Sequence, residues 1–355
     1  MTVLPHFSLD TPMPDVTMLA DLCADCRLVT REITDQNAYY GHDRILKAYA
    51  GLAATYPLKV MLPHAVQYNC GRPAPCIMRV PVLGYYTPER VSLLDDLGIT
   101  GRYWPFAMPF VYLMEMIRPC TEERRGTVIF PGHSVPGEDG ASGTASLAER
   151  VAALGRDIHP LTVCMFWWDV RLGRDLPFRE RVITVLTAGH PYDPNFLVRL
   201  YRIISRHRYV VTDAIGSHLF YAIKAGCRYF PLPNEDKLAW GDDLGDPILH
   251  ALYEAVRGFS VDDYSEQLQI ADHHLGVRYM LSSKELRSQL RRAELFDKLE
   301  FAIVREPKPH QLPVLAPAAV RRGARAPGKA VRRIGRRLRR IEEPDWMIDS
   351  QHADM

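Results

Sequence analysis

The sequence contains no run of about 18 consecutive apolar residues, which is the length that a membrane-spanning helix requires. Its first residues, MTVLPHFSLDTPMP, lack the basic and then apolar pattern of a secretory signal. Both absences argue against membrane-spanning and secreted classes, so we expect a cytoplasmic protein. With 355 residues and 47% hydrophobic content, the chain can bury one large core or two smaller ones.

Cysteine is scarce, and seven residues scattered along the chain fit reduced thiols better than a disulfide framework. Cys23 and Cys26 have the spacing that zinc and redox sites use, and Cys70 and Cys76 could complete a tetrahedral set. Ordinary half-buried thiols are the alternative, because a second close pair and a preceding thioredoxin-like strand are missing. The sequence also has no evident Asp-x-Asp metal site. We therefore expect neither a metal ion nor a cofactor.

Basic charge is concentrated in one segment near the C-terminus. Residues 321–340 hold ten Lys or Arg and no acidic residue, with Val331, Ile334 and Leu338 at helical spacing. This pattern predicts a short amphipathic helix on an anionic membrane surface, and so a peripheral position on the inner face of the cytoplasmic membrane. A solvated basic tail and a nucleic-acid patch are the alternatives. Interleaved aromatic residues are absent, so we expect no nucleic-acid partner.

Short apolar runs alternate with helical patterns, which predicts an α/β fold with parallel sheets. Two Rossmann-like lobes are expected, followed by a helical appendix and the basic tail. The expected domains are 1–121, 122–250, 251–307 and 308–355. In the first lobe we expect strands at 27–34 and 58–63 with a helix at 43–50 between them. In the second we expect strands at 127–130, 161–170, 179–189, 208–213 and 227–233.

Histidine and serine residues follow three of the predicted strands of the second lobe. These are His133 and Ser134, His190 and Pro191, and Ser217 and His218. Ligands of open parallel sheets bind beyond the carboxyl ends of the strands, where the next helix presents free N–H groups. Imidazole and hydroxyl groups beside such donors suit a phosphate, so we expect these side chains to gather around one phosphorylated group.

Each of these residues also has a simpler structural interpretation. Ser217 can cap the following helix, Asp213 can cap or form a turn, and His133 can satisfy a buried carbonyl. Trp167 and Trp168, on the predicted strand 161–170, would point to opposite faces and pack in the core or line the donor pocket. Asp169, at the end of this strand, is a secondary site candidate together with Asp213.

The motifs AGHP, VVTD and GSHLFYAIKAG, with YYGHDRILK and FPGHS, resemble the donor-nucleotide lobe of GT-B-fold glycosyltransferases of bacterial capsule and lipopolysaccharide synthesis. The resemblance covers residues 126–235. It implies that His190 and Pro191 match a His-Pro pair that holds a cytidine nucleotide and that Ser217 occupies a hydroxyl position. His218 departs from the pattern, because related families often have Ser or Thr there, and the acidic pair that contacts ribose in other branches is not evident.

The resemblance implies metal-independent transfer of a sugar from a nucleotide-sugar donor to a glycan or lipid-linked acceptor. Such a reaction needs a base for the acceptor hydroxyl and stabilisation of the departing phosphate. Asp35, His42 and His64 are the candidate bases in the first lobe. The alternatives are that Asp35 forms turn hydrogen bonds and that Tyr39 and Tyr40 pack between the lobes. A CDP-polyol phosphotransferase and a non-catalytic binding or assembly protein remain the other functional interpretations.

Overall fold

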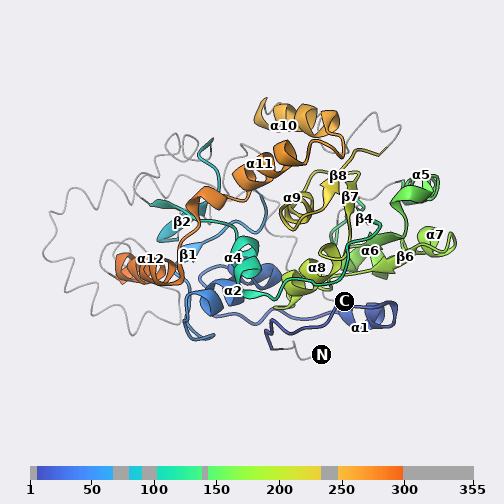
Figure 1. Cartoon of the computed structure of the whole chain (residues 1–355). Helices are drawn as coiled ribbons and strands as arrows, with labels where there is room; N and C mark the ends of the chain where they lie inside the picture. Colours follow the sequence, from blue (N-terminus) through green and yellow to red (C-terminus); the bar gives the residue numbers. More distant parts are fainter. Residues whose placement is uncertain (1–5, 67–79, 90–101, 138–142, 233–246, 299–355) are drawn as a thin grey trace, which may run out of the picture. The chain divides into compact units, whose positions relative to one another are not determined.

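The protein is described by a computed structural model that covers residues 6–66, 80–89, 102–137, 143–232 and 247–298, and two parallel sheets organise it (Figure 1). The first sheet has the order β1-β2-β3. Its strands are β1 (Val60–Met61), β2 (Val82–Tyr85) and β3 (Tyr103–Pro105), and both pairings are parallel. The predicted α/β class, with a parallel sheet in each half, is confirmed.

The second sheet has five parallel strands in the order β6-β5-β4-β7-β8. The strands are β4 (Thr127–Phe130), β5 (Leu161–Cys164), β6 (Thr184–Leu186), β7 (Tyr209–Thr212) and β8 (Arg228–Tyr229). The chain winds outward from β4 to β6 and then crosses back to β7, so the strand order reverses between β4 and β7. The carboxyl ends of these two strands are where doubly wound sheets bind ligands.

Both faces of the second sheet are buried, which explains why its strands are apolar without alternation. Val128 and Val210 point toward α8 (Phe196–Ile204) and α9 (Ser217–Lys224), in a core that continues into the first half. Ile129 and Val211 belong to a separate core beneath α5 (Thr144–Ala152) and α7 (Leu176–Arg179). The two halves of the chain therefore share one of the two main cores.

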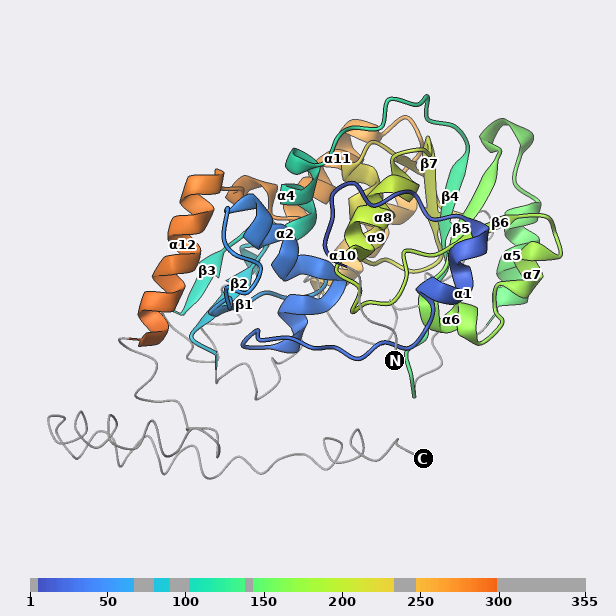
Figure 2. The same ribbon diagram turned by 90° about the horizontal axis from the view of Figure 1, so that it is seen from below.

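The helix predicted at 43–50 is confirmed as α2 (His42–Tyr49), one residue earlier in the chain. The first half contains η1 (Val16–Met18), α1 (Leu19–Leu22), η2 (Asp35–Gly41), α2 and α4 (Pro109–Met116). Helix α6 (Trp167–Arg171) follows β5, and η4 (Arg156–Ile158) precedes it. The chain continues with α10 (Pro247–Gly258), α11 (Tyr264–His274), η5 (Val277–Tyr279) and α12 (Ser283–Phe296). In Figure 2, α12 lies alongside the first sheet, where Gln289 donates to the carbonyl of Pro105 at 2.9 Å.

Several predicted strands are wrong in extent or in kind. The predicted strands 58–63, 179–189 and 227–233 are observed only as the shorter β1, β6 and β8. Residues 27–34 form no strand, because side chains instead of a backbone ladder attach this segment to β1. The amide of Asn37 donates to Val60 O at 2.7 Å and accepts from Leu62 N at 2.9 Å, so it occupies the free edge of β1. The predicted strand 161–170 ends at Cys164, and Trp167 and Trp168 lie on α6, not on opposite faces of a strand.

A buried cluster of charged side chains holds the segment 27–34 in place. The ammonium group of Lys47 lies 2.5 Å from Glu32 and 2.7 Å from Asp43, and all three side chains are almost fully buried. The second oxygen of Glu32 accepts from Leu58 N at 2.9 Å. Charges buried at this depth are tolerated because each is paired and hydrogen-bonded. The cluster therefore holds the approach to η2 against α2 and β1.

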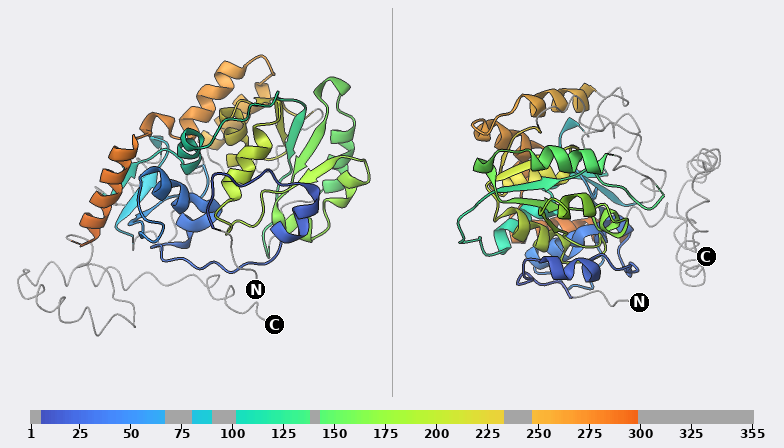
Figure 3. Two further views of the ribbon diagram at one scale, coloured as in Figure 1. Left: turned by 60° about the horizontal axis from the view of Figure 1, so that its bottom comes forward. Right: turned by 90° about the vertical axis from the view of Figure 1, so that its right-hand side faces the viewer.

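The N-terminal segment, residues 16–25, lies beside β6 and α6 at the edge of the second sheet (Figure 3). The predicted linker and basic tail, residues 308–355, lie outside the described residues. In the part of the chain that is described, no helix is both long enough and apolar enough to cross a bilayer.

Candidate functional site

The point of strand reversal is braced by side chains of the β7–α9 turn. The carboxylate of Asp213 accepts a hydrogen bond from Gly132 N, so it joins the ends of β7 and β4. The Nε2 atom of His218 lies 3.2 Å from Ala214 O and 3.0 Å from Thr212 Oγ1. A carbonyl can only accept, so Nε2 carries the proton and Nδ1 is an acceptor. Burial lowers the pKa of His218 to about 3, which keeps this bracing imidazole neutral.

Ser217, the first residue of α9, connects the two halves of the chain. Its hydroxyl accepts a hydrogen bond from Val66 N at 2.9 Å and also interacts with the phenol of Tyr221. The Tyr221 hydroxyl in turn donates to Met108 Sδ at 3.8 Å. The hydroxyl expected to meet a phosphate is thus already engaged with protein, and it positions the chain that carries His64.

His64 and His133 are the exposed imidazoles of this region, and they come from different halves. His133 follows β4 and packs against Phe166 with ring centroids 4.5 Å apart. His64 follows β1, and its pKa is lowered first by the surrounding protein and then by the nearby His133. A histidine with a lowered pKa is neutral at pH 7 and can accept a proton. His133 therefore lies within electrostatic range of His64, although 69 positions separate them in sequence.

Ser134, in contrast, faces the protein interior. Its backbone N–H donates to Asp169 Oδ2 at 3.1 Å, and its hydroxyl is held by Arg174. Arg174 also lies 2.7 Å from Asp169, which is 2% exposed. Asp169 and Ser134 therefore hold the loop after β4 against α6, and neither side chain is available to a ligand.

His190 lies in the loop after β6, and its protonation state is set by the backbone. Tyr192 N donates to His190 Nδ1 at 3.1 Å, so the proton of the neutral ring is on Nε2. Burial lowers the pKa of His190 to about 4, and its ring packs against Trp167 at 4.1 Å and Tyr192 at 4.7 Å. At pH 7 this side chain is therefore a neutral N–H donor, and 6% of the residue is exposed.

The His190 loop is fixed from below by a buried arginine. Arg199 pairs with Asp193 at 2.6 Å and donates to Ala188 O at 2.8 Å. Gly189 precedes His190 with φ of +100°, and a Cβ there would contact the Arg199 guanidinium at 3.0 Å. Glycine is required because both the left-handed backbone and the close approach exclude a side chain. The loop therefore presents His190 from a fixed backbone.

Residues 39–41 hold the His190 loop against the first half. Tyr40 has φ of 59° and donates its N–H to Pro191 O at 2.6 Å. Its ring packs on Phe196 at 4.7 Å, while Tyr39 packs on both Tyr192 at 5.4 Å and His64 at 5.7 Å. The packing of Tyr39 and Tyr40 between the halves is confirmed. Non-glycine residues in left-handed conformations are uncommon and concentrate at functional sites.

The other predicted bases differ sharply in exposure. His42 is fully buried, and neither ring nitrogen has a hydrogen-bond partner among the described residues. Burial lowers the pKa of His42 to about 3. An acceptor substrate cannot reach a side chain that is buried in the protein interior. Asp35 is exposed at the start of η2, not at the end of a strand, and lies within electrostatic range of Tyr39.

The structure thus brings His64, His133 and His190 to one edge of the second sheet, linked by aromatic rings. It does not place Ser134, Asp169 or His42 where a ligand could reach them. Sequence reasoning placed Tyr39 between the lobes but missed Tyr192 and Phe166, which also pack on the histidines. The sequence signal of Tyr192 was its position two residues after His190, whereas Phe166 lies inside the predicted strand 161–170 and had no such signal.

The thiols and acidic residues of the described ranges give no metal centre: no three His, Cys, Asp or Glu side chains there are grouped to hold an ion. Cys23 and Cys26 are free thiols, and burial raises the pKa of each to about 11. Cys70 and Cys76, proposed as further ligands, lie outside the described residues.

Comparison with known proteins gives no matching family model and no match among curated proteins. Among solved structures, the chain is similar to accessory secretory protein 1, 2 and 3 of Streptococcus pneumoniae, with 9% identity and a TM-score of 0.35 over 63% of this chain and 45% of that one. It is also similar to the wall teichoic acid polymerase TagF, with 11% identity and a TM-score of 0.34 over 62% of this chain and 57% of that one. The chain thus covers less than two thirds of either.

Proposed function

We propose that this protein is a glycosyltransferase that moves a sugar from a cytidine-linked donor to a surface-polysaccharide or lipid-linked acceptor without a metal ion. The observation that carries the proposal is a chain of packed rings at the carboxyl edge of the second sheet. It joins His64 of the first half, through Tyr39 and Tyr192, to His190 of the second. The two imidazoles come from opposite halves of the chain. A donor held by one half and an acceptor held by the other would meet there.

The donor phosphate would be bound by His190 and His133. The fixed tautomer of His190 supplies an N–H donor at Nε2 that needs no rearrangement, because its loop is held by Arg199 and Tyr40. Preorganised donors stabilise the charge that develops on a leaving phosphate. Ser217 and His218 act as positioning residues in this proposal, since their polar atoms already bond to protein.

His64 is the base that this proposal favours for the acceptor hydroxyl. Its lowered pKa keeps the imidazole neutral at pH 7, and its side chain is exposed to solvent. Asp35 is the second candidate, because it is exposed and close to Tyr39, which packs on His64. A general base must be both unprotonated and within reach of the hydroxyl. His42 meets the first condition and fails the second.

Melting curves with CMP, CDP, UDP and GDP test donor binding. We expect the cytidine nucleotides to raise the melting temperature, and His190→Ala to weaken their binding by about 10- to 100-fold, the effect of losing a charge-assisted hydrogen bond. His159→Ala is the matched control, because His159 is exposed and lies before β5 at the amino end of the same sheet. Unchanged melting with all four nucleotides would overturn the proposal. Phosphorus analysis of the product distinguishes sugar transfer from polyol-phosphate transfer.

The membrane association proposed for residues 321–340 needs a separate test. Deletion of residues 318–355 is expected to abolish binding to anionic vesicles in a flotation assay, because the ten basic residues of this segment are lost. The melting temperature of the truncated chain should stay within a few degrees of the full chain. Equal vesicle binding by both forms contradicts the proposal.

A further inference from the structure

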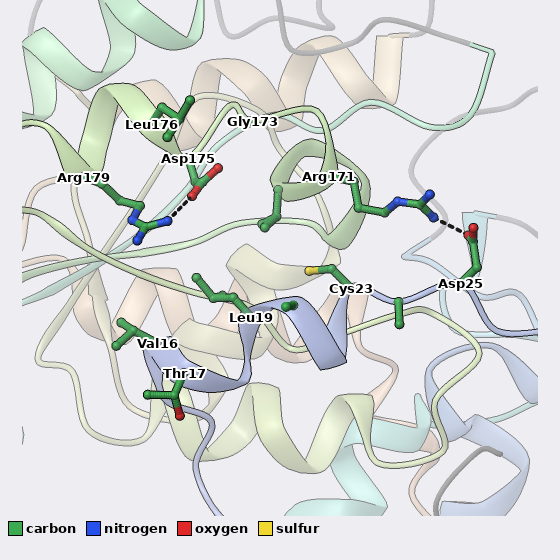
Figure 4. A pocket seen from close by; sticks show the side chains of 13 residues that line it. Val16, Thr17, Leu19, Cys23, Asp25, Arg171, Gly173, Asp175, Leu176 and Arg179 are labelled. Atoms are coloured by element: carbon green, nitrogen blue, oxygen red, sulfur yellow. Dashed lines mark hydrogen bonds and ion pairs between the residues drawn. The ribbon is translucent and has the colours of Figure 1, made fainter. Parts of the chain in front are cut away.

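A pocket of about 610 Å³ lies between the N-terminal segment and α6–α7 (Figure 4). Its size is in the range of small-molecule sites. Residues 16–25 form one wall, and the end of α6 with the start of α7 forms the other. The proposed donor site uses none of the side chains that line it.

The lining combines apolar side chains with two ion pairs. Val16, Leu19 and Leu176 contribute to the walls, and Thr17 and Cys23 are the neutral polar side chains among the described lining residues. Val16 and Leu176 are 54% and 53% exposed, so the apolar surface extends to the rim of the pocket. A hydrocarbon chain would find the surface it needs.

Arg171 gives the pocket a place for one anionic group. Its guanidinium lies 5.5 Å from the Trp167 ring and 5.2 Å from the Trp168 ring, so stacking holds it in place. One of its five N–H groups bonds to Asp25, whose side chain is 74% exposed. Surface ion pairs of this kind stabilise little, so an incoming phosphate can displace Asp25 and take both donors of the fork.

Arg179, at the other end of the pocket, is less suited to this role. It pairs with Asp175 at 3.2 Å, and Asp175 is 7% exposed while Arg179 is 58% exposed. Moving a buried carboxylate away from its only ion-pair partner in the described region costs more than releasing an exposed one. The pocket therefore offers one anion site, at Arg171, next to an apolar cavity.

The pocket also contacts the loop that carries His190. The Cys23 thiol interacts with the Thr187 hydroxyl, which accepts from Gly189 N at 3.1 Å. Asp25 and Arg171 lie within electrostatic range of His190 itself. A molecule with its anionic group at Arg171 would therefore lie near His190, which we propose as a hydrogen-bond donor to the phosphate of the donor substrate.

We propose that this pocket binds an anionic amphiphile, a phosphate monoester or diester of a hydrocarbon chain, with the phosphate on Arg171 and the chain between residues 16–24 and Leu176. If the proposed glycosyltransferase function holds, on which this identification rests, the ligand is the lipid phosphate end of the acceptor. Binding of the amphiphile itself does not depend on that function.

Isothermal titration calorimetry with the full chain tests the proposal, using decyl phosphate below its micelle concentration, decanol and inorganic phosphate. We expect decyl phosphate to bind at least about tenfold more tightly than decanol, and inorganic phosphate not to saturate the protein. Arg171→Gln should weaken decyl phosphate binding by about 10- to 100-fold and leave decanol unchanged. Leu176→Glu should weaken both, because it introduces a charge into the apolar wall.

Asp25→Asn provides the sharpest test, because it should improve binding. Removing the competing carboxylate frees Arg171, so decyl phosphate should bind several-fold more tightly, an effect that damage to the fold cannot imitate. Arg156→Gln, at an exposed arginine of η4, is the control and should change nothing. Equal or weaker binding by Asp25→Asn, or equal affinity for inorganic phosphate, overturns the proposal. If decyl phosphate binds while the four nucleotides do not, the donor proposal fails and the pocket assignment stands.

Discussion

Alanine at position 41 is expected to lower the free energy of unfolding by about 2–4 kcal/mol. Gly41 has φ of +77°, where a side chain costs about 1–2 kcal/mol. An added Cβ would also overlap the backbone carbonyl of Pro194, so the His190 loop would have to move away from Tyr40. Urea denaturation should show a lower midpoint with an unchanged slope, because the unfolded state is the same size.

Gly137→Ala separates the conformational cost from the overlap. Gly137 has φ of +91°, and a Cβ there would meet no atom of the described residues within 4 Å. This variant should lose only about 1–2 kcal/mol. The difference between the two variants measures how tightly residues 39–41 hold the His190 loop. If both variants lost the same free energy of unfolding, the contact between residues 39–41 and the His190 loop would contribute no measurable stability.

A second large effect is expected from pH, because His42 must remain neutral in the folded protein. Its folded pKa is about 3, while the unfolded chain titrates near 6.5. Between these values the unfolded state binds one more proton, so stability is complete above about pH 6.5 and falls as the pH is lowered toward 3. The contribution of this one residue should reach about 1.4 kcal/mol per pH unit in that window.

Comparing His42→Phe with His42→Asn identifies the cause of that slope. In both variants the free energy of unfolding, measured from pH 7.5 to 4.5, should depend less steeply on pH. The decrease in slope should correspond to one fewer proton taken up on unfolding. At pH 7.5, His42→Phe should stay within about 1 kcal/mol of the original protein, since the ring has no described hydrogen bond to lose. His42→Asn should be less stable at every pH, because it buries an unpaired amide. If the free energy of unfolding of His42→Phe depended on pH as steeply as that of the original protein, His42 would not be the cause of the slope.

Local sequence patterns predicted where the strands of the second sheet lie, although several of them are shorter than predicted. The apolar runs at β4 and β7 and the helices after them are confirmed, because a parallel strand buried on both faces has a sequence signature of its own. The placement of His190 just after β6 also followed from the chain order alone. In the first half the same reasoning failed at residues 27–34, which form no strand. There the carboxylate of Glu32 and the side-chain amide of Asn37 form hydrogen bonds with the backbone of residues 58–60, where a neighbouring strand would otherwise pair.

The chemical state of each candidate residue came from partners far away in the chain. Ser217 meets Val66 across 151 positions, and Ser134 meets Arg174 across 40, so neither engagement has a local signal. His42 and His64 are both histidines that the sequence predicts as candidate bases. In the structure His42 is completely buried and His64 is exposed.

By itself the sequence determined the α/β class, the strands and helices of the second sheet, and which histidines follow them, because these depend on burial patterns and turns within a few residues. Only the tertiary structure decided which polar groups are free, which tautomer His190 adopts, and that a pocket lies beneath Arg171. Hydrogen bonding and desolvation depend on every group that packs nearby, and those groups come from the whole chain.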